Sequence, residues 1–188
     1  MITKFNIYES INQFEFWDID FFINRNRFDN FKEWLESDIS DPNLFIFGKT
    51  LLMKSIDKNR IDFIELLLKH NVDVNQTNNR GYTALMYAVI NKNLKIVKIL
   101  IENGADLDYI NNKNKTALIY AASLNNKKIL QLLIDNNADW LHIDNKDKSF
   151  IDYLSKIRKE RIIVEYPEKY KYYLKYRKIR NKTNKFNL

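Results

Sequence analysis

The feature that most constrains this chain is a pattern that returns every 33 residues. Residues 81–110 serve as a template, and most other segments read as copies of them at that interval. The repeated positions are Thr83 with Thr50, Thr116 and, conservatively, Ser149; Leu85 with Leu52, Leu118 and Ile151; and Val97 with Ile64, Leu130 and Ile163. Self-similarity at a period of about 20 to 50 residues is typical of solenoids, in which each copy packs only on its neighbours.

Within the template, the apolar side chains are spaced for two short helices. The apolar positions are Leu85, Ala88 and Val89 in the first segment and Ile96, Val97, Leu100 and Ile101 in the second. The polar residues 91–93 separate the two segments, whereas Lys95, Lys98 and Glu102 fall on the opposite side of the second one. The pattern therefore predicts a helix-turn-helix unit whose second helix has a solvent-facing charged side.

The ends of the two predicted helices carry recognisable signals. Thr83 precedes the first helix, and its hydroxyl can accept a hydrogen bond from a free amide of the first turn. Gly104 follows the second helix and is replaced by Asn71 and Asn137 in the neighbouring copies. Because Gly and Asn tolerate the left-handed conformation that closes a helix, this exchange predicts a helix end at the same point of each copy.

The copies resemble ankyrin repeats, whose unit begins its first helix with the motif Thr-Pro-Leu-His-x-Ala. Here the corresponding segments read TALMYA at 83–88 and TALIYA at 116–121. The family's Gly-Ala-Asp-Val-Asn end is matched by GADLD at 104–108, NVDVN at 71–75 and NADWL at 137–141. The sequence departs from the motif where Ala replaces Pro, and where Met or Ile replaces the His that usually supplies hydrogen bonds between repeats.

This resemblance implies an all-α ankyrin-repeat solenoid of about five helix-turn-helix units with hairpin-like loops and atypical capping units at both ends. We expect one domain over residues 1–188, divided into an N-terminal capping unit (1–47), three strong repeats (48–144), a C-terminal capping unit (145–166) and a basic, tyrosine-rich tail or closing helix (167–188). In the family, loop tips and the concave face of such a solenoid bind other proteins.

The N-terminal unit is rich in aromatic residues. Shifting the template by two periods places its core on Ile19, Ile23, Phe31, Trp34 and Leu35. Further aromatic residues of this unit include Phe14, Phe16, Trp17, Phe21, Phe22 and Phe28. Two interpretations are open: packing of a capping repeat, which we favour, or an aromatic pocket for a ligand.

The C-terminal end is basic and less regular. Ser149, Ile151, Leu154, Ile162 and Ile163 keep the register of a fifth unit up to about Tyr166, and Pro167 then interrupts it. Tyr172, Tyr176 and Ile179 follow at helical spacing. The tail is interpreted either as a closing helix whose tyrosines cover the last repeat, or as a flexible arm that binds phosphate backbones. Residues 1–47 are net acidic and residues 145–188 net basic, which predicts a charge dipole along the solenoid.

Trp140 takes the register of Leu107 and Val74. These positions should pack at the base of the loops between repeats. We therefore expect the indole ring to be partly buried.

Catalytic and metal sites receive little support from the sequence. No HExxH, glycine-rich phosphate loop or GxSxG motif is present, and the chain has no cysteine. His70 falls at a predicted helix end, where a cation complements the helix dipole, and His142 falls in a loop as a candidate contact residue. Asp73, Asp106 and Asp139 occur once per copy, so they cannot converge on one ion and are expected to bond their own turns. We predict no enzyme activity, no cofactor and no metal.

Location and assembly follow from the same sequence. We see no signal peptide and no apolar run of the roughly 18 residues that cross a bilayer. The absence of cysteine favours a reducing compartment. We expect a cytoplasmic protein without a membrane partner, monomeric on its own.

Function is therefore predicted from the surface that the solenoid leaves free. By register, the candidate partner-binding residues are Lys49, Lys58, Asn79, Arg80, Tyr82, Ile90, Asn91, Ile110, Asn112, Lys113, Lys115, Leu124, Ile143, Lys146 and Lys148. Among them, Ile90, Ile110, Leu124 and Ile143 are expected to be exposed, with no role in the core. The main prediction is binding of another protein, not of nucleic acid. The alternatives are a dedicated inhibitor or immunity-type protein that blocks one enzyme or toxin, and nucleic-acid binding through the basic tail.

Overall fold

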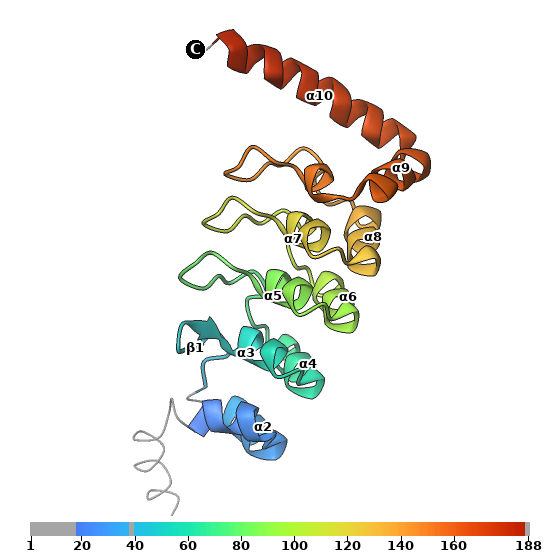
Figure 1. Cartoon of the computed structure of the whole chain (residues 1–188). Helices are drawn as coiled ribbons and strands as arrows, with labels where there is room; N and C mark the ends of the chain where they lie inside the picture. The colour runs from blue at the N-terminus through green and yellow to red at the C-terminus, as the bar shows by residue number, and fades with distance from the viewer. Residues whose placement is uncertain (1–17, 38–39, 187–188) are drawn as a thin grey trace, which may run out of the picture.

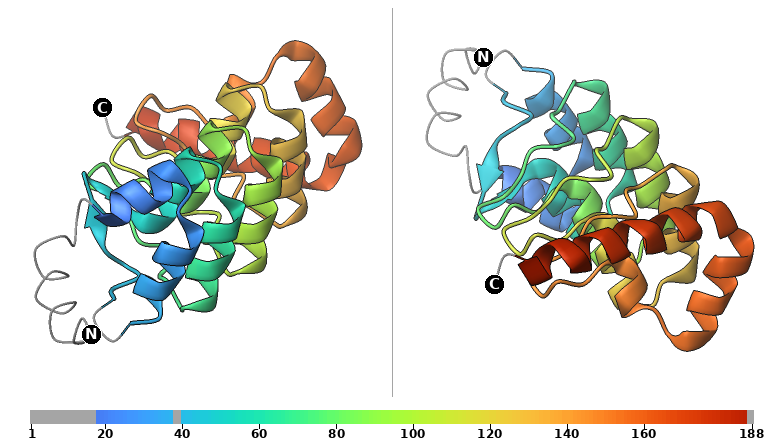
Figure 2. Two further views of the ribbon diagram at one scale, coloured as in Figure 1. Left: turned by 90° about the horizontal axis from the view of Figure 1, so that it is seen from below. Right: turned by 90° about the horizontal axis from the view of Figure 1, so that it is seen from above.

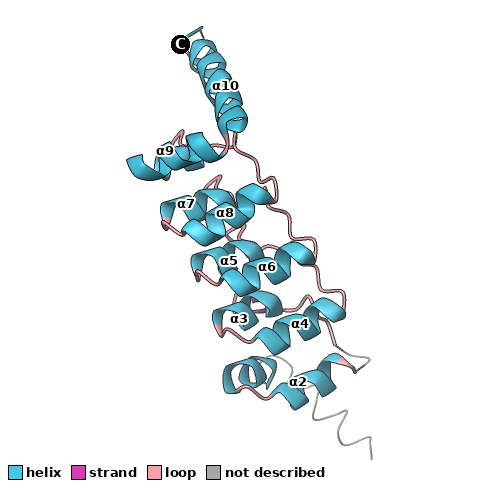
Figure 3. Cartoon of the chain, turned by 90° about the vertical axis from the view of Figure 1, so that its right-hand side faces the viewer, coloured by secondary structure: helices cyan, strands magenta, loops and turns pink. Residues whose placement is uncertain are grey.

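The computed structural model describes residues 18–37 and 40–186, and shows pairs of antiparallel helices stacked in one direction (Figures 1 and 3). Residues 18–25 are helical, and the elements that follow are α2 (Phe28–Leu35), β1 (Phe45–Ile46), β2 (Lys49–Thr50), α3 (Leu51–Asp57), α4 (Ile61–Lys69), α5 (Ala84–Ile90), α6 (Leu94–Glu102), α7 (Ala117–Ser123), α8 (Lys127–Asp135), the 3-10 helix η1 (Phe150–Tyr153), α9 (Lys156–Glu165) and α10 (Pro167–Phe186). The predicted all-α solenoid is confirmed. Only the short antiparallel hairpin β1–β2 adds strand among the described residues.

Threonine caps begin the first helix of each strong repeat, as the sequence predicts. The hydroxyl oxygens of Thr50, Thr83 and Thr116 accept hydrogen bonds of 3.2, 3.3 and 3.4 Å from the amides three residues ahead. Asn93 and Asn126 cap the second helices α6 and α8 in the same way. Because these side chains satisfy amides that a helix start leaves free, each repeat fixes its own helix boundaries.

Each repeat contains three left-handed backbone positions. One lies between its two helices, one ends the second helix and one lies at the tip of the loop. The members are Asn59, Lys92 and Asn125; Asn71, Gly104 and Asn137; and Gly48, Gly81, Asn114 and Asp147. The predicted left-handed helix ends are thus confirmed. At Gly81 (φ +72°), an added Cβ would lie 2.7 Å from Asn112 Oδ1, so this tip has no space for a larger residue.

The core runs continuously through the stack. The buried side chains include Leu85, Ala88 and Val89 of α5 and Ile96, Val97 and Leu100 of α6, and their counterparts in the flanking repeats. The first helices α3, α5 and α7 pack on one another, as do the second helices α6 and α8. Each repeat therefore buries its apolar side chains mainly through its neighbours, as expected for a solenoid.

Hydrogen bonds also join successive repeats without the family's His. Side-chain oxygens of Asn43, Asn75 and Asp108 accept bonds of 2.7, 2.8 and 2.7 Å from the amides of Asp73, Asp106 and Asp139. At the loop tips, the amide of Asn112 donates to the carbonyl of Arg80 (3.2 Å) and that of Asn145 to the carbonyl of Lys113 (3.4 Å). The loops thus form one continuous edge of the solenoid.

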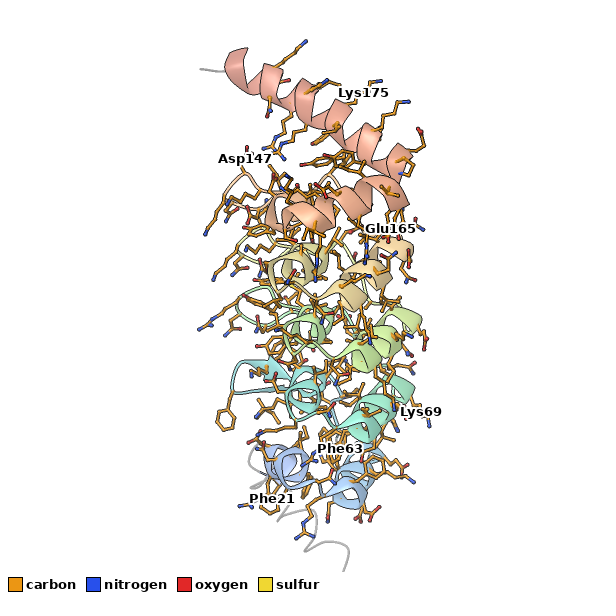
Figure 4. The ribbon with its side chains drawn as sticks, turned by 45° about the vertical axis from the view of Figure 1, so that its right-hand side comes forward. Phe21, Phe63, Lys69, Asp147, Glu165 and Lys175 are labelled. Carbon is orange, nitrogen blue, oxygen red and sulfur yellow. The ribbon has the colours of Figure 1, made fainter. Side chains whose placement is uncertain are left out.

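The N-terminal unit packs its aromatic residues into the stack. Phe31 is buried with its ring centroid 4.8 Å from that of Phe63 on α4, and Phe28 meets the same ring edge-on at 5.3 Å (Figure 4). Ile19, Ile23 and Leu35 are buried, whereas Phe21 is 46% exposed. The capping interpretation therefore accounts for the described aromatic residues near Phe63. Phe14, Phe16 and Trp17 lie outside the described residues.

The C-terminal unit departs from the predicted register. Its first helix is only the 3-10 turn η1, after which Leu154 is extended (φ −78°, ψ 145°). The second helix, α9, consequently begins at Lys156, about four residues earlier than the register of α6 requires. Ile162 keeps its predicted burial, but Ile163 is 38% exposed. The prediction of Ile163 as a core position was wrong because the shortened first helix shifts the second one.

Helix α10 crosses the end of the solenoid above the last loop (Figures 1 and 2). Tyr173 is buried on the last repeat, and Tyr166 and Tyr170 pack partly against the core. Tyr172, Tyr176 and Ile179, the stripe singled out in the sequence, are instead 62%, 40% and 56% exposed. Choosing Tyr172 as the start of the stripe rotates the chosen face by one residue, about 100° from the one that packs. None of the described helices is long and apolar enough to cross a membrane.

Candidate protein-binding face

The loops between repeats project to one side of the stack, beside the first helices α3, α5 and α7 (Figure 1). We call this surface the finger face, defined by residues 47–50, 78–83, 111–116 and 144–149 with the exposed side of α3, α5, α7 and η1. The second helices α4, α6 and α8 lie on the side of the first helices that faces away from the loops (Figure 1). The finger face therefore combines loop side chains and first-helix side chains from several repeats.

Two columns of the 33-residue register line this face. The residue before each capping Thr or Ser is Lys49, Tyr82, Lys115 or Lys148. The fourth residue after each capping Thr or Ser is Lys54, Tyr87, Tyr120 or Tyr153. Each side chain in the two columns is polar at its tip and apolar along the rest of its length. Their side chains can therefore contact each other across neighbouring repeats.

Tyrosines of the two columns form the tyrosine row, in which the Tyr82 ring contacts those of Tyr87 and Tyr120, and Lys115 joins Tyr120 to Tyr153. The Tyr82 ring lies 6.0 Å from Tyr87, edge-on, and 5.7 Å from Tyr120 between centroids. The hydroxyls of Tyr82 and Tyr120 are 2.8 Å apart, and Asn111 Nδ2 donates to the Tyr120 hydroxyl at 2.8 Å. Burial, together with the hydrogen bond to Tyr82, raises the pKa of Tyr120 well above its usual value. The row is thus a neutral, half-buried floor.

Lysines lie over this floor. Lys49 Nζ is 5.2 Å from the centroid of Tyr87, and Lys115 Nζ is 5.6 and 4.7 Å from those of Tyr120 and Tyr153. Ammonium groups at these distances are attracted by the ring faces. The tyrosine rings therefore help to hold Lys49 and Lys115 over the finger face, where each also lies beside a carboxylate.

A buried carboxylate anchors the last finger. Asp144 is 3% exposed and accepts bonds from the Tyr153 hydroxyl and from the amides of Lys146 (2.9 Å) and Lys148 (3.1 Å). Its oxygen also lies 3.6 Å from Lys115 Nζ. Burial alone would raise the pKa of Asp144, but these bonds and the lysine charge lower it below its usual value. Burial and the bond to Asp144 raise the pKa of Tyr153 to about 12.

Replacing this carboxylate gives a pH-dependent effect on stability. Asn78 and Asn111 occupy the same register position and make the same turn bonds, so Asp144→Asn preserves the turn. We expect it to lower the free energy of unfolding at pH 7 by about 1 to 2 kcal/mol, because the negative charge that strengthens the interactions with Tyr153, the turn amides and Lys115 is removed. A group with a lowered folded pKa stabilises above its unfolded pKa, about 3.9, and loses this contribution as the pH falls through the folded value.

Urea unfolding at several pH values measures this difference. The difference in the free energy of unfolding between the parent protein and Asp144→Asn (the gap) should be largest at pH 6 to 7 and shrink below about pH 4. Asp106→Asn is the matched control: it retains a turn acceptor at an exposed position and should give no such gap. A gap that is constant from pH 7 to pH 2 would contradict the ionised role of Asp144.

The predicted partner-binding residues lie on the finger face or directly beside it: Lys58, Asn91 and Leu124 follow α3, α5 and α7, and Ile110 and Ile143 precede two of its loop segments. Not all of them are free. Those exposed are Lys58, Asn79, Arg80, Asn91, Ile110, Asn112, Lys113, Lys146 and Lys148, and those half-buried are Lys49, Tyr82, Ile90, Lys115, Leu124 and Ile143. Of the four aliphatic residues expected to be exposed, only Ile110 is, at 45%. The expectation was wrong for Ile90, Leu124 and Ile143, which are half-buried. Tyr82 belongs to the tyrosine row.

Sequence reasoning overlooked part of this face. Tyr87, Tyr120 and Tyr153 recur at the 33-residue interval, one each in α5, α7 and η1, yet they were not singled out. The signal was present in the motif segments TALMYA and TALIYA, whose fifth residue is Tyr in both. Interruption of an apolar pattern by a recurring aromatic residue with a polar tip indicates a position at the boundary between core and surface.

The two histidines and the three aspartates that recur once per copy have structural roles. His70 is the C-cap residue of α4, as predicted, and His142 Nε2 lies 2.9 Å from the carbonyl oxygen of Asn114. Asp73, Asp106 and Asp139 each accept a bond of 2.8 to 2.9 Å from the amide two residues ahead, which confirms the predicted turns. Within the described part of the chain, no group of three His, Asp or Glu side chains could hold a metal ion.

Comparison with known families agrees with this architecture. The family model "Ankyrin repeats (3 copies)" matches residues 21–111 and 77–147. No curated protein matches the chain. Ankyrin repeats are in general protein-protein interaction modules and are typically not catalytic. The two matches together cover more than half of the sequence and coincide with the stacked helix pairs, so the chain belongs to the ankyrin-repeat family.

Proposed function

We propose that this protein binds a partner protein through the finger face and performs no catalysis of its own. The observation that carries the proposal is a set of exposed cationic side chains that form no ion pair, gathered on this face from successive repeats. Among the described residues, Arg80, Lys113, Lys146 and Lys148 make no ion pair. Exposed Ile110 lies in the loop that leads to the tip bearing Lys113.

These residues are presented rigidly. The left-handed tips and the bonds between neighbouring loops fix the backbone, and the tyrosine row fixes the floor behind it. A prearranged surface loses little conformational freedom on association, which favours binding. The outer surface of the second helices, which we call the convex side, also carries exposed lysines, at Lys95, Lys98 and Lys128. These lysines come from helix surfaces with no comparable loops.

Charge reversal on the two sides tests the proposal. The full chain is tagged, used to capture proteins from its native host, and the captured partner is identified by mass spectrometry. Arg80→Glu, Lys113→Glu and Lys146→Glu combined should weaken capture by at least tenfold, since arginine and central charged contacts are frequent hot spots. Lys95→Glu, Lys98→Glu and Lys128→Glu combined change the net charge equally and should leave capture within about twofold.

The thermal midpoints of both triple variants serve as the folding control, because all six side chains are exposed. Loss of capture in the convex variant, with normal capture by the finger variant, would place the interface on the second helices and overturn the proposal.

A further inference from the structure

We infer that the partner contributes an acidic, extended segment to the finger face, with carboxylates spaced about three residues apart. This inference rests on the proposed function and adds the chemistry of the partner. Its basis is an imbalance of charge: the acids on the finger face already have partners, whereas several of its cations have none.

The paired acids are easily identified. Asp57 is bound by Lys49 and Asn91, and buried Asp144 is bound by Tyr153 and lies beside Lys115. Near α10, Arg177 Nη1 lies 2.7 Å from Asp152 Oδ1, and Arg180 Nη2 lies 2.7 Å from Asp147 Oδ1 (Figure 4 shows Asp147 at its loop). Each acid of the finger face is thus occupied within the described part of the chain.

The unpaired cations repeat with the fingers. Arg80, Lys113 and Lys146 occupy one register position at successive tips, and Lys148 lies two residues beyond the last of them. All four are exposed. Such a row of like charges raises the local concentration of anionic partners and speeds their association.

Spacing indicates the conformation of the partner. Each finger has two chain segments, and adjacent strands lie about 4.8 Å apart, so successive tips should repeat at about 10 Å. Packed helices repeat at a similar 8 to 10 Å. A polyproline II segment has three residues per turn and rises about 3.1 Å per residue, so every third side chain returns to one side after about 9 Å. Carboxylates at this spacing would meet successive tips.

The tyrosine row argues for a polypeptide over a nucleic acid. Single-stranded nucleic acids bind aromatic rings by stacking bases on exposed ring faces. Here the Tyr82, Tyr87 and Tyr120 rings are half-buried and contact each other. The hydroxyl of Tyr82 lies 2.8 Å from that of Tyr120, and Asn78 Nδ2 donates to the hydroxyl of Tyr87. The row therefore offers a floor for extended backbone and no platform for bases.

The test is a selection of random 12-residue displayed peptides against the full chain, followed by fluorescence anisotropy with synthetic versions of the selected peptides. We expect enrichment of Asp or Glu at intervals of three residues. Replacing those acids by Gln or Asn should weaken binding at least tenfold, and binding should weaken as salt is raised.

Two variants distinguish failure of the acidic inference from failure of the finger face as the binding site. Their thermal midpoints are measured first to show that both variants fold. Lys113→Gln, Lys146→Gln and Lys148→Gln combined remove charge, while Ser123→Trp, at an exposed position on α7, adds bulk at the finger face without changing charge. Both should abolish binding of the acidic peptides. If the selected peptides lack acidic residues but their binding is still blocked by Ser123→Trp, the acidic inference is overturned and the finger face remains the binding site. Peptides unaffected by either variant would overturn the finger face as well.

A labelled 20-nucleotide single-stranded DNA is the third probe. We expect it to bind more weakly than the selected acidic peptides at 150 mM salt. If this DNA binds more tightly than the peptides and the triple Gln variant no longer binds it, the inference of an acidic polypeptide is overturned in favour of a nucleic acid. A selection that yields no binding peptide would also overturn the inference.

Discussion

Trp140→Ala should lower the free energy of unfolding by about 3 to 5 kcal/mol, the usual cost of truncating a buried large aromatic side chain. The ring is 6% exposed, as its register predicted, and its centroid lies 5.2 Å from Phe150 and 5.7 Å from Tyr166, edge-on to both. These contacts join the last strong repeat to η1 and to Tyr166, the residue between α9 and α10. The cavity would therefore weaken the attachment of the whole C-terminal unit.

Trp140→Phe is the matched control. The indole Nε1 is buried and makes no hydrogen bond among the described residues, so replacing it with carbon removes no bond. In urea unfolding at pH 7, we expect this variant to lose less than half as much free energy of unfolding as Trp140→Ala does. A loss below about 0.5 kcal/mol for Trp140→Ala would show that the ring is not part of the core, and would make it a candidate contact residue.

Deleting residues 167–188 should destabilise the protein by about 2 to 4 kcal/mol and lower its thermal midpoint. Tyr173 is 3% exposed, and burial of one large side chain contributes roughly 1.5 to 3 kcal/mol. Its hydroxyl lies 2.9 Å from Ser149 Oγ, the N-cap of η1, and Arg177 bonds Asp152 of the same turn. Removal of α10 would expose this end of the core, which a terminal unit must shield from water.

The same deletion tests nucleic-acid binding by the tail. Lys171, Lys175 and Lys178 are exposed on α10, and Lys175 points away from the last repeat in Figure 4. Their combined replacement by Gln should leave the thermal midpoint within about 2 °C, since each is a solvated surface charge. If α10 acts as a cap, the deletion lowers stability without changing affinity for duplex DNA. Unchanged stability with lost DNA affinity would support the arm instead.

The sequence predicted the repeating part of the fold well because each repeat carries its own signals. Thr83 caps a helix, Gly104 ends one, and Asp106 bonds its own turn, and all three depend only on neighbouring backbone. Such local effects recur wherever the residues recur. The positions of α3 to α8 therefore followed from the 33-residue register.

The C-terminal end was less predictable because its geometry depends on contacts between distant segments. The early start of α9, which exposes Ile163, reflects the shortening of the preceding helix to η1. Which tyrosines of α10 face the core is set by Ser149 and Asp152, more than twenty residues earlier. Periodicity gives the spacing of such a stripe, and only the packing partner gives its orientation.

The candidate site shows the same division. Register placed Arg80, Lys113 and Lys146 at the loop tips, where they are exposed. Register did not reveal that Tyr82 contacts Tyr120 and Lys115 lies beside Asp144, because these contacts cross between repeats. The composition of the finger face was thus predictable, and the distinction between its occupied and free residues was not.

Amide hydrogen exchange of the full chain, alone and with its captured partner, tests the finger face most directly. The account predicts that binding slows exchange in residues 77–83, 110–116 and 143–149, which form the loops of three successive repeats, while exchange in α4, α6 and α8 is unchanged. Slowed exchange in the second helices α4, α6 and α8, with the loops unaffected, would contradict it.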